Sequence, residues 1–356
     1  MTSHLSARIL WRALPKFSNL PASSQMPRWT RSYATDQRSR TAIVTGSSRG
    51  IGKAIAIRMA HDGYDVCIND IQANKSGCDE VVKEIQKLGR KSFAYTADVS
   101  NLKEVQGLVK SSVEELGPLN TMVANAGIAQ VKALLDLTPD DLSRMFQVNG
   151  IAASPEYYTL VLTSHSVRRL QLLLNGRKTD DISGQWGQVT WCSQCKLYPC
   201  LNQVGPANST VFKDYRQWCT FSSSVSCTRH LLIFASQKIV AFKPFALLSH
   251  YSASKWAVRG MTQAFAMEMA EHKITVNAYA PGIVGTAMWD LIDEKLGEKT
   301  GAKKGDTIKK YTDELIALGR TSVPEDVAST VSFLSSKDSD YMTGQTIVID
   351  GGIIFT

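Results

Sequence analysis

The chain has 356 residues, of which 44% are hydrophobic, and a formal net charge of +8. This length accommodates one large domain or two small ones around a substantial core. Seven cysteines in a chain of this size do not form the dense disulfide framework of a small secreted protein. No apolar run reaches about 18 residues, so we expect no membrane-spanning segment.

The first 35 residues contain no Asp or Glu, and five basic residues lie among Leu, Trp, Phe and Ser: Arg8, Arg12, Lys16, Arg28 and Arg31. This composition is typical of a mitochondrial transit peptide. We predict a transit peptide at residues 1–34, a catalytic domain at 35–356 and a location in the mitochondrial matrix. A disordered basic tail on a cytoplasmic protein is the alternative. Without these five charges the net charge falls from +8 to about +3, too little to favour a nucleic-acid partner.

From residue 41 onwards, short apolar runs alternate with amphipathic stretches. The runs at 41–46, 65–70, 92–98 and 121–127 are typical of buried strands, and those at 51–63, 78–89 and 101–117 have helical spacing. Thr138 and Pro139 begin another helix, as cap and first-turn residue. Further strands are predicted at 275–282 and 346–352. Such alternation predicts a single α/β domain with a Rossmann-like, doubly wound parallel sheet.

Residues 150–238 depart from this pattern. They hold five of the seven Cys and three of the seven Trp, and their apolar residues keep no sustained period. Cys192, Cys195 and Cys200 have a spacing similar to metal ligands, but no second pair or His follows at zinc-site distance. We therefore predict no metal site.

A glycine-rich turn joins the first predicted strand to the first helix, in the stretch "TGSSRGIG". Glycine at these points allows a sharp turn and a close approach of the backbone to a pyrophosphate at the helix N-terminus. We predict that this turn binds a dinucleotide cofactor through Gly46, Ser48, Arg49, Gly50, Ile51 and Gly52.

Asp70 ends the second predicted strand, 24 positions after Gly46. A carboxylate there accepts hydrogen bonds from the adenosine ribose and repels a 2′-phosphate, which favours NAD(H) over NADP(H). Arg49 favours NADP(H) instead, because its side chain could pair with the 2′-phosphate. We favour NAD(H), with NADP(H) as the alternative.

Several separated motifs together resemble the short-chain dehydrogenase/reductase family: the three glycines, Asp98 in "ADVS", "NAG" at 125–127, Asn149 in "FQVN", Tyr251 and Lys255 in "YSASK", and "PG" at 281–282. The resemblance covers residues 40–149 and 239–352. Within the family, residues 251–289 are most similar to the NAD(H)-dependent diacetyl/acetoin reductases, also called meso-2,3-butanediol dehydrogenases.

The resemblance implies the remaining cofactor contacts and the catalytic set. It places Asp98 and Val99 beside the adenine, Asn125, Ala126 and Gly127 along the cofactor, and Pro281, Gly282 and Thr286 beside the nicotinamide. It makes Tyr251, Lys255 and Asn149 catalytic, with Tyr251 and Lys255 also touching the cofactor, and residues 287–298 a variable substrate lid. It further implies a homotetramer acting on a small carbonyl or alcohol substrate.

Tyr251 and Lys255 are four residues apart, so they share one helix face. A phenol of pKa about 10 is a poor proton donor at neutral pH, and a neighbouring ammonium lowers that value by stabilising the phenolate. The pair therefore predicts proton transfer to a ketone that receives a hydride.

The family's usual serine is absent from its position 13 residues before the tyrosine, which Lys238 occupies. Ser236 and Ser249 are near, but either would need a shift of strand register to replace it. Three functions stay open: an acetoin-type or diacetyl-type reductase, a mitochondrial 3-oxoacyl-thioester reductase, and a nucleotide-binding pseudoenzyme.

One reading of the codons explains the anomalous segment. Residues 166–194, read one nucleotide later with allowed codons, can give "AYGVFNCYSTAARQMISQGNGGKLLGAAS", which has the missing helix and strand and ends in the missing Ser. We interpret 150–165 and 195–238 as translated introns around an exon in the wrong frame. For the chain as written, we predict that it folds poorly, or that it extrudes the segment as a disordered loop around an incomplete sheet that lacks its central strand.

Overall fold

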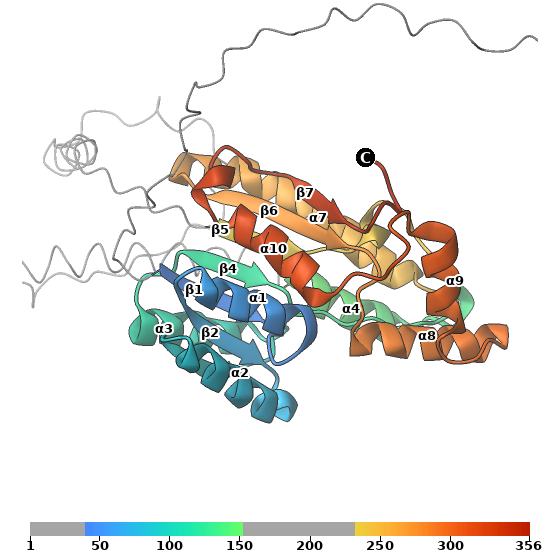
Figure 1. Ribbon diagram of the computed structural model, residues 1–356, viewed down its shortest axis with the longest axis horizontal. Helices are drawn as coiled ribbons and strands as arrows, with labels where there is room; N and C mark the ends of the chain where they lie inside the picture. The colour runs from blue at the N-terminus through green and yellow to red at the C-terminus, as the bar shows by residue number, and fades with distance from the viewer. Residues whose placement is uncertain (1–39, 152–231) are drawn as a thin grey trace, which may run out of the picture. The chain divides into compact units, whose positions relative to one another are not determined.

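The structure is a computed structural model that describes residues 40–151 and 232–356, all within one compact unit, Ser39–Thr356 (Figure 1). The predicted transit peptide, the three cysteines at 192, 195 and 200, and residues 152–231 lie outside the described residues.

A seven-stranded sheet forms the centre of the unit, with every adjacent pair parallel and the order β3-β2-β1-β4-β5-β6-β7. The strands are β1 Arg40–Thr45, β2 Tyr64–Asp70, β3 Ser92–Thr96, β4 Thr121–Ala124, β5 Leu232–Ser236, β6 Thr275–Pro281 and β7 Thr346–Ile349. The strand order reverses between β1 and β4, the point where doubly wound sheets bind ligands at the carboxyl ends of their strands. The predicted fold class is therefore confirmed.

Helices cover both faces of this sheet (Figure 1). Apolar residues of α1 (Gly50–His61), α2 (Lys75–Lys87) and α10 (Pro324–Leu334) form the core on one face, whereas α3 (Leu102–Leu116) and α7 (Ser249–Met269) form the other. Helix α4 (Pro139–Ile151) packs on α7. In the part of the chain that the structure describes, the remaining helices are α8 Ala287–Thr300 and α9 Asp306–Leu315. Short 3-10 turns there cover Gln72–Asn74, Leu134–Asp136, Ile239–Ala241, Ala270–His272 and Lys337–Ser339.

The central strand is present, so the prediction of an incomplete sheet is wrong. Strand β5 pairs with β4, Thr121 beside Leu232, and with β6, Ser236 beside Tyr279. Its sequence, LIFAS, is a short continuous apolar run. A strand buried on both faces has this composition and shows no alternation, so the absence of a period did not exclude a strand.

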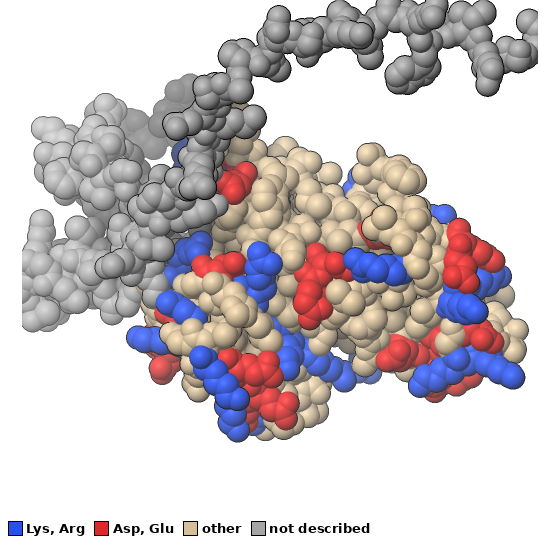
Figure 2. Space-filling model, in the orientation of Figure 1, with Lys and Arg blue, Asp and Glu red and all other residues tan. Residues whose placement is uncertain are grey.

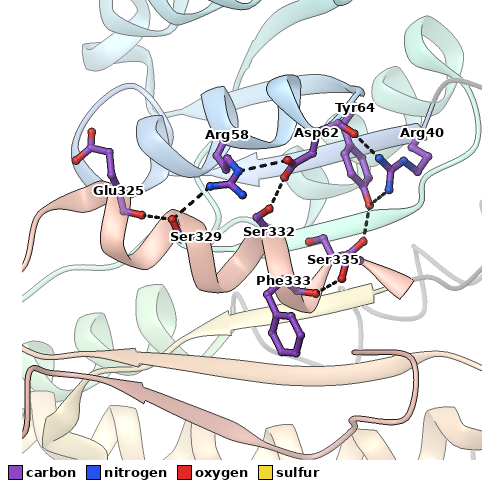
Figure 3. Close-up of polar contacts among 10 residues, drawn as sticks. Arg40, Arg58, Asp62, Tyr64, Glu325, Ser329, Ser332, Phe333 and Ser335 are labelled. Carbon is purple, nitrogen blue, oxygen red and sulfur yellow. Dashed lines mark hydrogen bonds and ion pairs between the residues drawn. The ribbon is translucent and has the colours of Figure 1, made fainter. Parts of the chain in front are cut away.

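Polar contacts fasten α10 to α1, the helix that begins at the glycine-rich turn (Figure 3). Arg58 donates to Ser329 Oγ over 3.3 Å, and Ser332 Oγ donates to Asp62 Oδ2 over 2.5 Å. At the start of β2, the Tyr64 hydroxyl donates to the Ser335 carbonyl over 2.9 Å. The position of α1, and of the turn before it, is therefore fixed by contacts with the C-terminal part of the chain.

Figure 2 shows Lys and Arg interspersed with Asp and Glu over the face in view. This face has no broad basic area of the kind that binds nucleic acid electrostatically. Within residues 40–151 and 232–356, no helix combines the length and hydrophobicity needed to cross a bilayer.

Candidate active site

The glycine-rich turn adopts a conformation that requires its glycines. Gly46 and Gly50 have φ of +62° and +56°, in the left-handed region that side chains disfavour. A Cβ on Gly52 would lie 2.2 Å from the Gly46 carbonyl oxygen, and one on Gly46 would lie 2.9 Å from Ala126 Cα. The turn thus passes directly over the end of β4. Arg49 is exposed at the helix start, whereas Ile51 is half-buried and packs on the core.

Asn125 ties the end of β4 to this turn. Its side-chain amide donates to the carbonyls of Thr45, over 2.9 Å, and Gly46, over 3.1 Å, while its Oδ1 accepts from the Tyr279 hydroxyl. The backbone N–H groups of Asn125 and Ala126 both donate to Thr45 Oγ1. The Asn125 side chain and these two N–H groups therefore hold the end of β4 against the glycine-rich turn.

Asp70 lies at the carboxyl end of β2, beside the turn. Its Oδ2 accepts from the hydroxyl of Ser48 over 2.5 Å, and its Oδ1 accepts from the Asn74 amide and the Ile71 N–H, each over 2.9 Å. These donors fix the carboxylate next to the turn, which is the position predicted for ribose recognition.

A hollow of about 450 Å³ opens beside Asp70, between the ends of β2 and β3. Its walls include Asp98, and a planar group could lie between the two strand ends there. The residues around the hollow are Ile71, Gln72, Ala73, Thr96, Ala97, Asp98 and Glu104. Val99, which was also predicted beside the adenine, is buried and is not among them.

Asn149, in the last turn of α4, is joined to the start of α7 through a serine. Its amide donates to Ser254 Oγ over 3.1 Å, and that hydroxyl donates to the Tyr251 carbonyl over 2.7 Å. The same Asn149 side chain accepts from the Ile128 N–H and donates to the Ile128 carbonyl. Thr138 begins α4 as predicted, because its hydroxyl accepts from the Asp141 N–H.

Tyr251 and Lys255 lie in the first turns of α7 and both are nearly fully buried, at 4% and 3% exposed. The Lys255 ammonium lies 5.8 Å from the centre of the Tyr251 ring and donates to the Ser236 carbonyl over 2.8 Å. Gly127 leaves the space in which Asn149 and Lys255 converge, since a Cβ there would lie 3.1 Å from Asn149 Oδ1 and 3.5 Å from Lys255 Nζ. The structure therefore brings together all three predicted catalytic residues.

The pKa of Tyr251 is not lowered, contrary to what was expected from the neighbouring Lys255 ammonium. Burial raises the pKa of Tyr251 above its ordinary value. Burial, and then the nearby Lys238 charge, lower the pKa of Lys255 to about 7. Burial lowers the pKa of Lys238 itself to about 8. A second ammonium beside Lys255 therefore weakens the charge that was expected to acidify the phenol.

An apolar cavity of about 30 Å³ lies against Tyr251. Its lining comes from the β5–α7 connection, from Gly282 after β6, and from α8 and α9: Lys238, Ile239, Val240, Phe245, Ala246, Leu248, Tyr251, Gly282, Met288, Trp289, Ile292, Leu296 and Tyr311. Ser236 and Ser249 do not line it, and the Ser236 hydroxyl instead bonds Tyr279. Pro281 ends β6, and Thr286 precedes α8, its methyl group 3.6 Å from where a Cβ on Gly50 would lie.

The sequence did not single out three residues that shape this site. Ser254 connects Asn149 to Tyr251, Thr45 holds the 125–126 backbone, and Tyr279 orients Asn125. Ser254 could have been found from its place inside "YSASK", one turn after the tyrosine. Nothing local marks Tyr279, which lies on β6, two strands away from β4, and reaches Asn125 only once the sheet is formed.

Family profiles match this chain in two blocks that flank the anomalous segment. Residues 40–156 match the short chain dehydrogenase profile, and residues 233–354 match a profile described as enoyl-(acyl carrier protein) reductase. The chain belongs to the short-chain dehydrogenase/reductase family. It is therefore an oxidoreductase, as its motifs predicted.

Curated relatives cover most of the chain. An L-2,3-butanediol dehydrogenase of Corynebacterium glutamicum is 34% identical over 317 residues, which is 89% of this chain and 99% of that relative. A diacetyl reductase [(S)-acetoin forming] of Staphylococcus epidermidis is 33% identical over 318 residues, again 89% of this chain and 99% of the relative. The predicted similarity to diacetyl/acetoin reductases is thus confirmed.

Solved structures agree in fold. The L-sorbose reductase of Gluconobacter frateurii, complexed with NADPH and L-sorbose, matches with a TM-score of 0.67 and 20% identity, over 89% of this chain and 97% of that one. Acetoin dehydrogenase YohF of Salmonella typhimurium matches with a TM-score of 0.60 and 23% identity, over 89% and 96%. At these identities the likeness shows the fold alone.

Proposed function

We propose that this chain is an NAD(H)-dependent reductase of a small ketone or vicinal diketone, of the acetoin and diacetyl type, with Tyr251 as the acid/base. The observation that carries the proposal is the position of Tyr251, which lines a small apolar cavity while Lys255 and Asn149 converge behind it. The named relatives, a butanediol dehydrogenase and a diacetyl reductase, support the substrate class.

The residues at the switch point fit a dinucleotide. The left-handed glycines expose backbone N–H groups at the start of α1, and the hollow beside Asp98 accepts a planar base. Asp70, already oriented by Ser48 and Asn74, is placed to bind the ribose hydroxyls and to repel a 2′-phosphate. When bound, the nicotinamide supplies or accepts the hydride. NAD(H) is the form that this carboxylate favours.

The side chains supply the proton and hold the substrate. In reduction, Tyr251 gives its phenolic proton to the substrate oxygen, and the Lys255 ammonium stabilises the phenolate that remains. Asn149 and Ser254 keep the start of α7 in register with α4, so the phenol stays directed at the cavity. The narrow apolar lining favours a small diketone over an extended acyl thioester.

Substitution of the phenol tests this function. We expect the parent protein to oxidise NADH in the presence of diacetyl, and Tyr251→Phe to lose about 100-fold or more in kcat, the usual contribution of a general acid. Tyr95→Phe is the matched control, since it removes the hydroxyl of a half-buried tyrosine on β3 that packs against the core and takes no part in the site. Equal turnover by Tyr251→Phe and parent would overturn the proposal.

A nucleotide-binding protein without turnover is the second candidate, and Lys238 favours it. This residue stands where the family's serine is expected, and its charge lowers the pKa of Lys255. NADH binding measured by calorimetry, without oxidation of NADH by diacetyl, would support this candidate.

We also keep two proposals about the chain itself. Residues 1–34 act as a mitochondrial transit peptide, which N-terminal sequencing of the mature protein checks. The gap between the two profile matches, 157–232, supports the proposal that introns and a frameshifted exon occupy 150–238. A translated transcript that retains the whole segment would refute it.

A homotetramer is the proposed assembly. Large apolar side chains are exposed on α4 (Leu142, Phe146) and α7 (Trp256, Met267), and exposed apolar surface of this kind commonly marks contacts between subunits. Light scattering on the purified protein distinguishes a tetramer from a monomer.

A further inference from the structure

Helix α9 forms part of the wall of the cavity at Tyr251. Most of the lid surface comes from α8, through Met288, Trp289, Ile292 and Leu296, and α9 adds Tyr311. The Tyr311 ring packs against Phe245, which also lines the cavity, with ring centres 6.1 Å apart and planes tilted by 45°. The cavity is therefore small because α9 holds Tyr311 against a residue of the β5–α7 connection.

Asp293 is the residue that holds α9 to α8. Its side chain is 1% exposed, and its Oδ2 accepts from the Gly305 N–H over 2.5 Å while its Oδ1 accepts from the Ile308 N–H over 3.0 Å. Among the described residues, no Lys or Arg forms an ion pair with it. The buried charge is therefore stabilised by the free N–H groups and the dipole at the start of α9.

The turn between the two helices has no room to adjust. A Cβ on Gly297 would lie 2.7 Å from the Ala302 carbonyl oxygen, so the turn packs closely on α8. Gly305 precedes α9 with φ of +92°, a conformation that suits glycine. Helices α8 and α9 and their turn thus form one unit, in which Asp293 sets the place of Tyr311.

We propose that Asp293 is a positioning residue that fastens α9 to α8, and that Tyr311 and Phe245, brought together in this way, limit the substrate to small aliphatic carbonyl compounds. This proposal rests on the proposed function. It assigns the limit on substrate size to Tyr311 and Phe245, and the placement of Tyr311 to Asp293.

Replacement of Tyr311 tests the size limit. The probes are diacetyl and acetylbenzoyl, in which a phenyl ring replaces one methyl group. We expect Tyr311→Ala to raise the ratio of kcat/KM for acetylbenzoyl over diacetyl by about tenfold or more, the range that pocket size confers on discrimination. Tyr311→Phe, which keeps the ring, should leave the ratio unchanged. An unchanged ratio in Tyr311→Ala would overturn the assignment.

Replacement of Asp293 tests its role as a positioning residue. We expect Asp293→Asn to raise KM for diacetyl by about tenfold while kcat falls by less than about threefold, because the reacting groups are not altered. Hydrogen exchange should accelerate at the amides of α9 and stay unchanged in α7, which also shows that the domain is folded. Asp306→Asn is the matched control, since Asp306 is an exposed carboxylate at the start of the same helix.

The outcomes separate this proposal from the proposed function. If the parent does not reduce diacetyl, the proposed function fails. Hydrogen exchange at the amides of α9 then still tests the role of Asp293. Calorimetric binding of acetylbenzoyl to the NADH complex of Tyr311→Ala still tests the role of Tyr311. If α9 exchange is the same in Asp293→Asn and Asp306→Asn, Asp293 does not hold the helix and the proposal is wrong.

Discussion

The glycine-rich turn and the β5–α7 connection both follow strands at the carboxyl edge of the sheet, yet their polar groups are satisfied to different degrees. In the first region, Thr45, Ser47, Ser48 and Asn125 all form hydrogen bonds. Among the described residues, nine buried side-chain atoms lack a hydrogen-bond partner, and four of them lie in residues 237–252: Gln237 Oε1, Ser249 Oγ, His250 Nδ1 and Ser252 Oγ. The unsatisfied groups are thus concentrated beside Tyr251.

This difference distinguishes the proposed nucleotide site, whose polar side chains are hydrogen-bonded, from the proposed catalytic site, where several are not. Each buried polar group left without a partner costs about 1–3 kcal/mol, and a partly satisfied network is less stable than an apolar core. Lys238 adds a charge to the same region without an acceptor from any described residue. The pattern is what the intron proposal expects, because Lys238 is the last residue of the segment that it removes. Substitution of single residues, first in one region and then in the other, tests this difference.

Lys238→Ser should have the largest effect, because it restores the family's hydroxyl and removes the charge that opposes Lys255. We expect kcat/KM for diacetyl to rise by about 10- to 100-fold, the scale of one well-placed donor in an active site. Since the pKa of Lys255 is about 7 in the parent, activity that needs its ammonium should fall as the pH rises through 7. In the variant this decline should move to higher pH.

The pH profile distinguishes charge removal from hydroxyl gain. Lys238→Met removes the charge without supplying a hydroxyl, so it should shift the profile as Lys238→Ser does but leave kcat/KM low. A profile that stays fixed in both variants would show that Lys238 does not control Lys255.

The sequence predicted the glycine-rich turn and the carboxylate at the end of β2 because their signals are local. A glycine that needs positive φ, such as Gly46, or a carboxylate at a strand end, such as Asp70, is visible in a short window of sequence. The strand β5 was missed because LIFAS is a short continuous apolar run with no alternation to read. The contact between Asp293 and the start of α9 was also missed, because it depends on how two helices pack.

The electrostatics of the catalytic pair could not be predicted from spacing alone. Positions i and i+4 indicated that Tyr251 and Lys255 share a face, which the structure supports. The direction of each pKa depends on burial and on Lys238, which approaches Lys255 from the end of β5. The spacing of Tyr251 and Lys255 therefore predicts that they lie on one helix face, whereas the direction of their pKa shifts depends on the tertiary structure.

Asp70→Asn should change the preference for NADH over NADPH, by less than Lys238→Ser changes kcat/KM for diacetyl. Loss of the negative charge removes the repulsion of a 2′-phosphate, so we expect the kcat/KM ratio of NADH to NADPH to fall by about tenfold, or about 1.4 kcal/mol. Asp79→Asn is the matched control, because this carboxylate on α2, the helix after β2, forms an ion pair with Lys75 on the same helix. Where turnover is low, the ratio of the two dissociation constants, measured by calorimetry, replaces kcat/KM. A ratio that both variants leave unchanged would assign cofactor choice to other residues.

The smallest expected effect is a dependence of stability on pH that comes from Lys255 and Lys238. In the folded chain the pKa values of Lys255 and Lys238 are lowered to about 7 and about 8 from 10.5. Between pH 7 and pH 9.5 the unfolded chain therefore binds more protons than the folded chain, and stability rises with pH. We expect the melting temperature to increase by a few degrees across this window. In Lys238→Ser the slope should be shallower, because one lysine is gone and the pKa of the other moves toward its ordinary value. Calorimetric scans at several pH values measure the dependence of the melting temperature on pH. Equal slopes in parent and variant would mean that water solvates the Lys238 ammonium. Lys238 would then not repel the Lys255 ammonium, and the two regions would not differ in this respect.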